Sequence, residues 1–255
     1  MRLTTIGTGT AAPSPARVCS AQLVETRGVR LLLDCGSGSV HRMAQLGIDW
    51  MAITQVALTH FHADHTSDLA TLIFAWRYGA IPWREAAITL IGPPGTTDLI
   101  ARIDAAFGGA FGTLGYRIDV REVAAGEQVA LESDVHLTSH RVPHTAESVA
   151  YSIQAGATRI VYTGDTGRDP ALAEWAAGCD LLLAECSLPE SMKMATHLTP
   201  EDCGELAGVA GPGMLVLTHF YPPVEAVDIR GIVAERYAGP VVLASDGWST
   251  VIEEM

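Results

Sequence analysis

The most informative stretch of the sequence is VALTHFHADH, from Val56 to His65. A short apolar run leads directly into the candidate ligands His60, His62, Asp64 and His65. A polar surface loop explains a single histidine, but imidazole and carboxylate groups at this spacing are typical ligands of zinc and similar metals. Because local geometry aims these side chains in different directions, two neighbouring ions would use them better than one. The stretch therefore predicts a metal site directly after a buried strand.

The segments around this stretch alternate between short apolar strands and helices. A buried strand is expected at Gln55–Thr59, followed by an irregular loop and a helix over Ser67–Tyr78 whose N-terminus faces the loop and favours an anion there. A second helix is expected over Thr199–Ala210, since Thr, Pro and acidic residues open it. Val224–Tyr237 is expected to be mostly helical, and Val241–Ala244 to be the last strand.

A second copy of Leu-Thr-His-Phe occurs in LVLTHFYPP, Leu215–Pro223, without the ligands that follow the first copy. LLLDCGSG (Leu31–Gly38) and VLASDGWS (Val242–Ser249) form another pair, each with an aspartate and a glycine after an apolar strand. These echoes suggest two related halves, each a sheet flanked by helices. No linker or low-complexity segment interrupts the sequence, so residues 1–255 are expected to form one domain.

Composition restricts the class of protein. The 255 residues are 48% hydrophobic, yet no apolar run reaches the roughly 18–20 residues of a membrane span. The opening MRLTTIGTGT lacks the apolar block of a signal peptide, so a cytoplasmic location and no membrane partner are expected. Five scattered cysteines argue against a disulfide framework. The net charge of −13, with scattered Lys and Arg, weighs against nucleic acid as the main partner.

The sequence resembles a known family at several motifs. The motifs, in chain order, are His60-x-His62-x-Asp64-His65, VPHT with His144, VYTGDTG with Asp165, and VLTHF with His219. The first is similar to the H-x-H-x-D-H signature of the metallo-β-lactamase fold. The opening IGTGTAAPSPARVCSAQLVE and LLLDCGSGS are similar to the ribonuclease Z branch. The resemblance covers nearly the whole chain, and it implies an α/β fold: a four-layer αββα sandwich of two pseudo-symmetric halves, with metals at the seam.

The resemblance also implies the metal ligands. One ion would be held by His60, His62 and His144, the other by Asp64, His65 and His219, and Asp165 would bridge both with a water or hydroxide. The cofactors expected are two divalent ions, with zinc favoured by the imidazole-rich set and manganese or iron compatible with it. Asp64 would also orient the nucleophile or carry its proton.

Two further residues match catalytic positions of the ribonuclease Z branch. LLLAECS places Glu185, and THLTPEDCGELA places His197, although Ala184, Cys186 and Leu198 depart from the branch's motifs. In that branch the histidine faces the scissile phosphate and the glutamate orients it. A protonated imidazole there would stabilise developing charge or protonate a leaving oxygen.

Other acidic and histidine residues have weaker assignments. Asp34, at the end of an apolar strand, is expected to orient a ligand imidazole or to cap a turn, and the same orienting role is weaker for Asp246. His41, His136 and His140 match no motif and are expected to be structural.

The function expected is a dinuclear metal-dependent phosphodiesterase that attacks a small or cyclic phosphodiester with a metal-bridging hydroxide. Ribonuclease Z-type cleavage of tRNA 3′ ends is disfavoured, because the stretch between His144 and His197 has no long basic arm and only Arg159, Arg168 and Lys193 as cations. Hydrolysis of carboxylic esters or lactones, and metal binding without turnover, are further alternatives. The branch often forms dimers, so a homodimer is expected.

Overall fold

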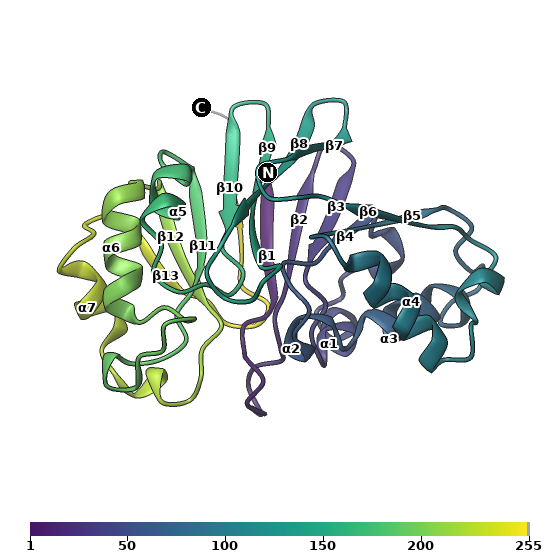
Figure 1. Ribbon diagram of the computed structural model, residues 1–255, viewed down its shortest axis with the longest axis horizontal. Helices are drawn as coiled ribbons and strands as arrows, with labels where there is room; N and C mark the ends of the chain where they lie inside the picture. The colour runs from purple at the N-terminus through teal and green to yellow at the C-terminus, as the bar shows by residue number, and fades with distance from the viewer. Residues whose placement is uncertain (254–255) are drawn as a thin grey trace.

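The computed structural model describes residues 1–253, which form two seven-stranded sheets (Figure 1). The first sheet has the order β14-β1-β2-β3-β4-β5-β6 and the second has the order β13-β12-β11-β10-β9-β8-β7. The strands of the first sheet are β1 (Arg2–Gly7), β2 (Ala21–Thr26), β3 (Val29–Leu33), β4 (Gln55–Ala57), β5 (Ile88–Gly92), β6 (Ile118–Glu122) and β14 (Ser249–Val251). Those of the second are β7 (Gln128–Glu132), β8 (Val135–Arg141), β9 (Val149–Ala155), β10 (Thr158–Tyr162), β11 (Leu181–Glu185), β12 (Met214–Thr218) and β13 (Val241–Leu243).

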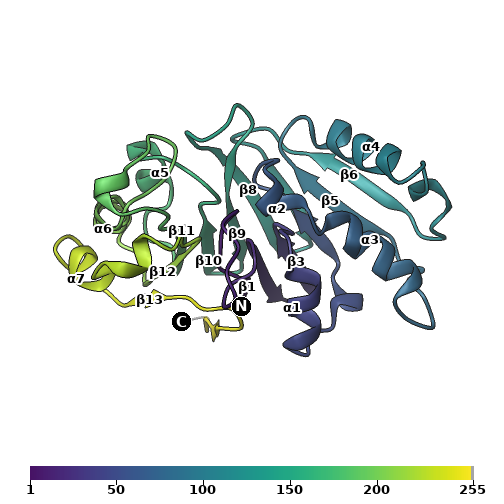
Figure 2. The ribbon, with the colours of Figure 1, turned by 90° about the horizontal axis from the view of Figure 1, so that it is seen from below.

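Helices cover the outer faces of both sheets (Figure 2). The first half contributes α1 (Ser39–Gln45), α2 (Ala63–Thr66), α3 (Leu69–Tyr78) and α4 (Thr96–Ala106). The second half contributes α5 (Pro170–Trp175), α6 (Pro200–Ala210) and α7 (Ile229–Ala234). Short 3-10 segments lie at Trp50–Ala52, Phe111–Thr113, Glu190–Met192 and Val224–Ala226. None of the helices in residues 1–253 combines the length and the apolar character that crossing a bilayer requires.

Three apolar layers hold these elements together. The middle layer lies between the two sheets and includes Leu31, Tyr151 and Leu183, all fully buried. The outer layers pack α1, α3 and α4 on the first sheet, and α5, α6 and α7 on the second. Strands covered on both faces are apolar along their whole length, as in the buried run at Leu181–Leu183. The expected αββα sandwich is confirmed.

The two sheets share one pairing pattern, which confirms the two related halves. From one edge, each sheet has three antiparallel pairings followed by three parallel ones. The doubled Leu-Thr-His-Phe does not follow this symmetry, because the first copy comes directly after β4 and the second begins within β12. Counted from the antiparallel edge of each sheet, β4 of the first sheet corresponds to β11 of the second, and β5 corresponds to β12. The sequence echo is therefore not a repeat of equivalent strands.

The elements differ from the expected ones in three places. The loop after β4 contains the short helix α2, and the next helix begins at Leu69. Val224–Tyr237 divides into a 3-10 segment and α7, whose cap Asp228 accepts a hydrogen bond from the Gly231 N–H. β14 follows the expected last strand and pairs with β1. Its three residues, Ser-Thr-Val, are too few to show an alternating pattern.

The sheets place the functional side chains together. Asp34 follows β3, His60 follows β4, Asp165 follows β10 and His219 follows β12, while Glu185 ends β11. Carboxyl ends of neighbouring parallel strands meet at one edge of a sheet, where ligands of α/β folds bind. These five residues thus lie at the edge where the two sheets face each other.

Candidate metal centre

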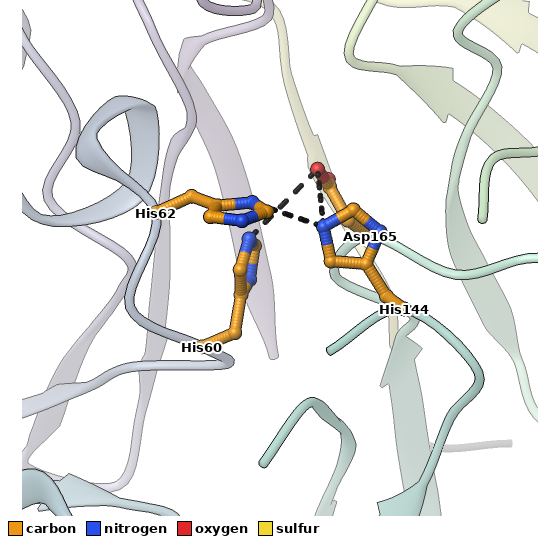
Figure 3. Close-up of side chains that lie close together, drawn as sticks. All are labelled: His60, His62, His144 and Asp165. Carbon is orange, nitrogen blue, oxygen red and sulfur yellow. Dashed lines mark hydrogen bonds and ion pairs between the residues drawn. The ribbon is translucent and has the colours of Figure 1, made fainter. Parts of the chain in front are cut away.

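The first group of candidate ligands brings four side chains together from both halves (Figure 3). Donor atoms of His60, His62, His144 and Asp165 all lie within 4.8 Å of one another. His144 Nε2 is 3.0 Å from His62 Nδ1, and it is 3.8 Å from Asp165 Oδ2. His60 Nε2 is 3.9 Å from the same oxygen. His62 caps α2, whereas His144 lies in the loop between β8 and β9.

The second group consists of Asp64, His65, Asp165 and His219, again within 4.8 Å of one another. His65 Nε2 and His219 Nε2 are 3.4 Å apart, and they lie 3.2 and 3.4 Å from Asp165 Oδ1. Asp64 Oδ2 is 3.4 Å from His219 Nε2. Ligand atoms on a tetrahedral zinc with bonds of about 2.0–2.1 Å are about 3.3 Å apart. The second group therefore has the spacing of a coordination shell.

Asp165 belongs to both groups, with one carboxylate oxygen facing each. Oδ2 faces His60 and His144, while Oδ1 faces His65 and His219. The residue is only 3% exposed. Its position between the groups is the arrangement of a bridging carboxylate.

The donor atoms fit a pair of divalent cations. His60 Nε2 is buried without a hydrogen-bond partner, and so is Asp165 Oδ1, which lies near His65 Nε2 without an aligned hydrogen bond. Buried polar atoms of native proteins nearly always have a partner, and a cation at each group would supply one for each of these two atoms. Imidazole nitrogens with carboxylate oxygens suit zinc, manganese or iron.

His60, Asp64 and Asp165 have the ionisation that cation binding requires. Burial and the neighbouring imidazole of His65 lower the pKa of His60 to about 2, which keeps His60 neutral and able to ligate. Burial opposes ionisation of Asp165, but His219 and His65 outweigh it and hold the pKa of Asp165 well below its usual range. For Asp64, burial is likewise outweighed by the hydrogen bond from His219, which lowers the pKa to about 2. Burial lowers the pKa of His65, but Asp165 and Asp34 outweigh it and hold that pKa well above its usual value, so His65 must lose a proton to ligate.

Asp34 orients an imidazole of the second group, as expected. Its Oδ2 is 2.8 Å from His65 Nδ1 and accepts a hydrogen bond from the Tyr162 hydroxyl, also at 2.8 Å. The Thr59 hydroxyl contacts both Asp34 and His60 Nδ1, the latter at 3.0 Å. Asp34 thus holds His65 directly and His60 through Thr59, and directs their Nε2 atoms toward Asp165. Such partners fix the tautomer of a ligand imidazole.

Asp246 has a different role from the one expected. Its carboxylate accepts hydrogen bonds from the Thr8 hydroxyl at 2.7 Å and from the Val18 N–H at 2.8 Å. It therefore secures the N-terminal loop between β1 and β2 instead of orienting an imidazole. The start of this loop lies beside the site, because the Thr8 carbonyl accepts a hydrogen bond from the N–H of Phe220, the residue after His219.

Glu185 and His197 form a pair beside the two groups. His197 Nδ1 lies 3.2 and 3.1 Å from the two carboxylate oxygens of Glu185, which is fully buried. The His197 ring is 4.9 Å from that of His144 and stacks at 5.9 Å on that of His219. Burial lowers the pKa of His197, but the Glu185 carboxylate outweighs this and raises it to about 9.

Some residues near the site were not expected from the sequence. Ser187 contacts both Glu185 and His219, and the Tyr221 ring lies 6.2 Å from that of His197 and 5.9 Å from that of His219. Their nearness in sequence to Glu185 and His219 was the only signal. His140 lies outside both groups, with its ring stacked on Trp175 at 4.9 Å.

Comparisons with known proteins identify a family and a fold. Residues 29–220 match the family described as the beta-lactamase superfamily domain. A ribonuclease Z from Mycobacterium sp. (strain KMS) is 30% identical over 96% of this chain and 94% of its own length. The metallo-beta-lactamase fold protein YhfI from Bacillus subtilis superposes with a TM-score of 0.84, at 22% identity and 98% of both chains. The short form of human tRNase Z superposes with 0.81, at 24% identity and all of both chains.

Proposed function

Because the chain belongs to the beta-lactamase superfamily, as a metal-dependent hydrolase of the ribonuclease Z-like kind, we propose that it hydrolyses a small or cyclic phosphodiester. The proposal assigns His60, His62 and His144 to one cation, and Asp64, His65 and His219 to the other, with Asp165 between them. Its main support is that each oxygen of Asp165 faces a different group of imidazoles.

Residues of this chain would orient the attacking water and protonate the leaving oxygen. Two bound cations would supply Lewis acidity toward a phosphoryl oxygen and would lower the pKa of a water, so that it loses a proton and becomes the nucleophile. Asp64 would orient that water or carry its proton. The His197 bond to Glu185 uses Nδ1, which leaves Nε2 to give a proton to the leaving oxygen. Glu185 belongs to neither proposed ligand set, although its carboxylate also lies within 4.8 Å of donor atoms of His197 and His219.

The preference for a small substrate rests on charge. The chain carries a net charge of −13. Between His144 and His197 its cations are already engaged: Arg168 pairs with Glu205 at 2.6 Å, and Lys193 with Asp202 at 2.9 Å. Arg159 donates to the Ser152 hydroxyl and to main-chain carbonyls. A polyanion such as tRNA needs several free cations along its backbone.

Ribonuclease Z-type cleavage of tRNA 3′ ends is the second candidate. It is favoured by the curated relatives, which are named ribonuclease Z. The two candidates differ in their rates on a precursor tRNA and on small diesters. Faster processing of the tRNA would overturn the preference for a small substrate while leaving the hydrolytic centre in place.

Removal and return of metal test the proposed chemistry. Chelated protein is expected to lose hydrolysis of bis-p-nitrophenyl phosphate and to regain it when Zn²⁺ or Mn²⁺ is restored, because the attacking water depends on the cations. The measurement is the rate of nitrophenolate release alongside the metal content of the protein. Full metal occupancy without turnover would contradict a phosphodiesterase.

Glu185→Gln is expected to shift the alkaline limb of the kcat/KM profile to lower pH. With the carboxylate outweighing burial, the pKa of His197 is about 9, so the imidazolium is lost only as pH rises through that value. Glutamine carries no charge, so the proton would be lost nearer the ordinary histidine pKa of about 6.5. Glu205→Gln, which alters a partly exposed glutamate paired with Arg168, serves as the control. An unshifted limb in Glu185→Gln would remove its assigned role.

A further inference from the structure

Ser187 is a fully buried residue that contacts both the Glu185 carboxylate and the His219 imidazole. It lies two residues after Glu185, and its Oγ donates to Glu185 Oε2. The same oxygen is 2.9 Å from His219 Nδ1 and 3.2 Å from the His219 carbonyl oxygen. Its main chain joins the same segments, since its N–H donates to the Leu198 carbonyl and its carbonyl accepts from the Tyr221 N–H.

Counting protons fixes the direction of these hydrogen bonds. A serine hydroxyl has one proton and accepts through its lone pairs, whereas carboxylate and carbonyl oxygens only accept. His219 Nε2 faces Asp64, His65 and Asp165, each at 3.4 Å. When that nitrogen ligates a cation, the neutral imidazole carries its proton on Nδ1 and donates it to Ser187. Ser187 then donates to Glu185, which accepts from His197 Nδ1.

We propose that Ser187 is a positioning residue that joins the ligand His219 to the Glu185–His197 pair through its single hydroxyl. This inference rests on the proposed function, in which His219 binds a cation. The hydroxyl fixes the tautomer and ring orientation of His219, and it holds Glu185 at the position that His197 requires. The φ of His219 is 58°, a left-handed conformation that is uncommon outside glycine, and Ser187 Oγ lies close to both the ring and the carbonyl of this residue.

The other half of the molecule contains the same construction. There the Thr59 hydroxyl lies between the Asp34 carboxylate and His60 Nδ1, at 3.1 and 3.0 Å from Asp34 and 3.0 Å from His60. Both hydroxyls therefore connect a buried carboxylate at the end of a strand with an imidazole whose Nε2 faces Asp165. Only Ser187 connects to a carboxylate that also holds a proposed catalytic histidine.

Zinc affinity of the full chain tests the inference without substrate. In competition with a chromophoric chelator, Ser187→Ala is expected to bind zinc about 10- to 100-fold more weakly than the native protein at one of its two sites. Ser187→Thr, which keeps the hydroxyl, is expected to restore the affinity. Ser139→Ala removes another buried serine hydroxyl, which contacts the Ala124 and Glu127 carbonyls, and is expected to bind zinc as the native chain does.

A second measurement distinguishes a specific loss of the hydrogen bond from unfolding of the variant. In the zinc-loaded native protein, NMR is expected to show a slowly exchanging Nδ1–H of His219, and this signal is lost in Ser187→Ala while the amide spectrum remains that of a folded protein. Native zinc affinity with a retained Nδ1–H signal in Ser187→Ala would overturn the inference. Because neither measurement uses a substrate, failure of diester hydrolysis would count against the proposed function alone.

Discussion

Asp165→Asn is expected to reduce zinc-dependent hydrolysis of bis-p-nitrophenyl phosphate to the rate of the metal-free protein. The substitution keeps the size of the side chain but removes the charge that faces four imidazoles, two from each carboxylate oxygen. A neutral amide nitrogen cannot replace the second carboxylate oxygen as a ligand. The zinc content after gel filtration and the rate of nitrophenolate release measure the effect.

Asp169→Asn is the matched control for this variant. Asp169 lies four residues further along and caps α5 by accepting from the Ala171 N–H, a role that asparagine fills equally well. It is expected to retain both zinc content and rate. Retention of both in Asp165→Asn would show that the carboxylate does not join the two groups, and the assignment of the ligand sets would be wrong.

His197→Ala is expected to bind zinc as the native protein does and to lose about 10²- to 10⁴-fold in kcat. The loss follows from the absence of a proton donor for the leaving oxygen. It is therefore expected to be larger for a cyclic nucleotide, whose leaving alkoxide is strongly basic, than for bis-p-nitrophenyl phosphate, whose nitrophenolate leaves without assistance. Parallel kinetics on the two substrates, with zinc titration, provide the measurement.

His140→Ala is the control for a general effect of removing a histidine. His140 stacks on Trp175 and lies outside both groups of candidate ligands. Its removal is expected to leave the ratio of the two rates unchanged. An equal loss on both substrates in His197→Ala would argue that His197 stabilises charge on the phosphoryl group and does not protonate the leaving oxygen.

The candidate site was predictable from the sequence because its residues occur in motifs. The seven proposed ligands and the Glu185–His197 pair come together as the motifs suggest. The strand-end position of Asp34 indicated its contact with His65. The homodimer, the cytoplasmic location, the single domain and the ligand roles themselves stay predictions.

The remaining features depend on tertiary contacts that leave no local pattern. The helical turn at Ala63–Thr66 forms where the sequence suggests a ligand-rich loop. Ser187 follows Glu185 at a spacing that gives no hint of His219, which is 32 residues away. Asp246 resembles Asp34 in its sequence setting but bonds to the N-terminal loop, because β13 lies beside β12 and not at the position of β3.

The candidate ligands come from both sheets, and this has a consequence for how the enzyme responds to its supply of cofactor. His62 and His144 are 82 residues apart in the chain, and His65 and His219 are 154 apart. Occupied ligand sets would act as cross-links between these distant segments, and closures of this length restrict the unfolded chain most. A ligand that binds only the native state also raises its stability by mass action. Scarcity of metal would therefore shorten the lifetime of the folded chain as well as its activity, so that protein abundance would follow metal availability.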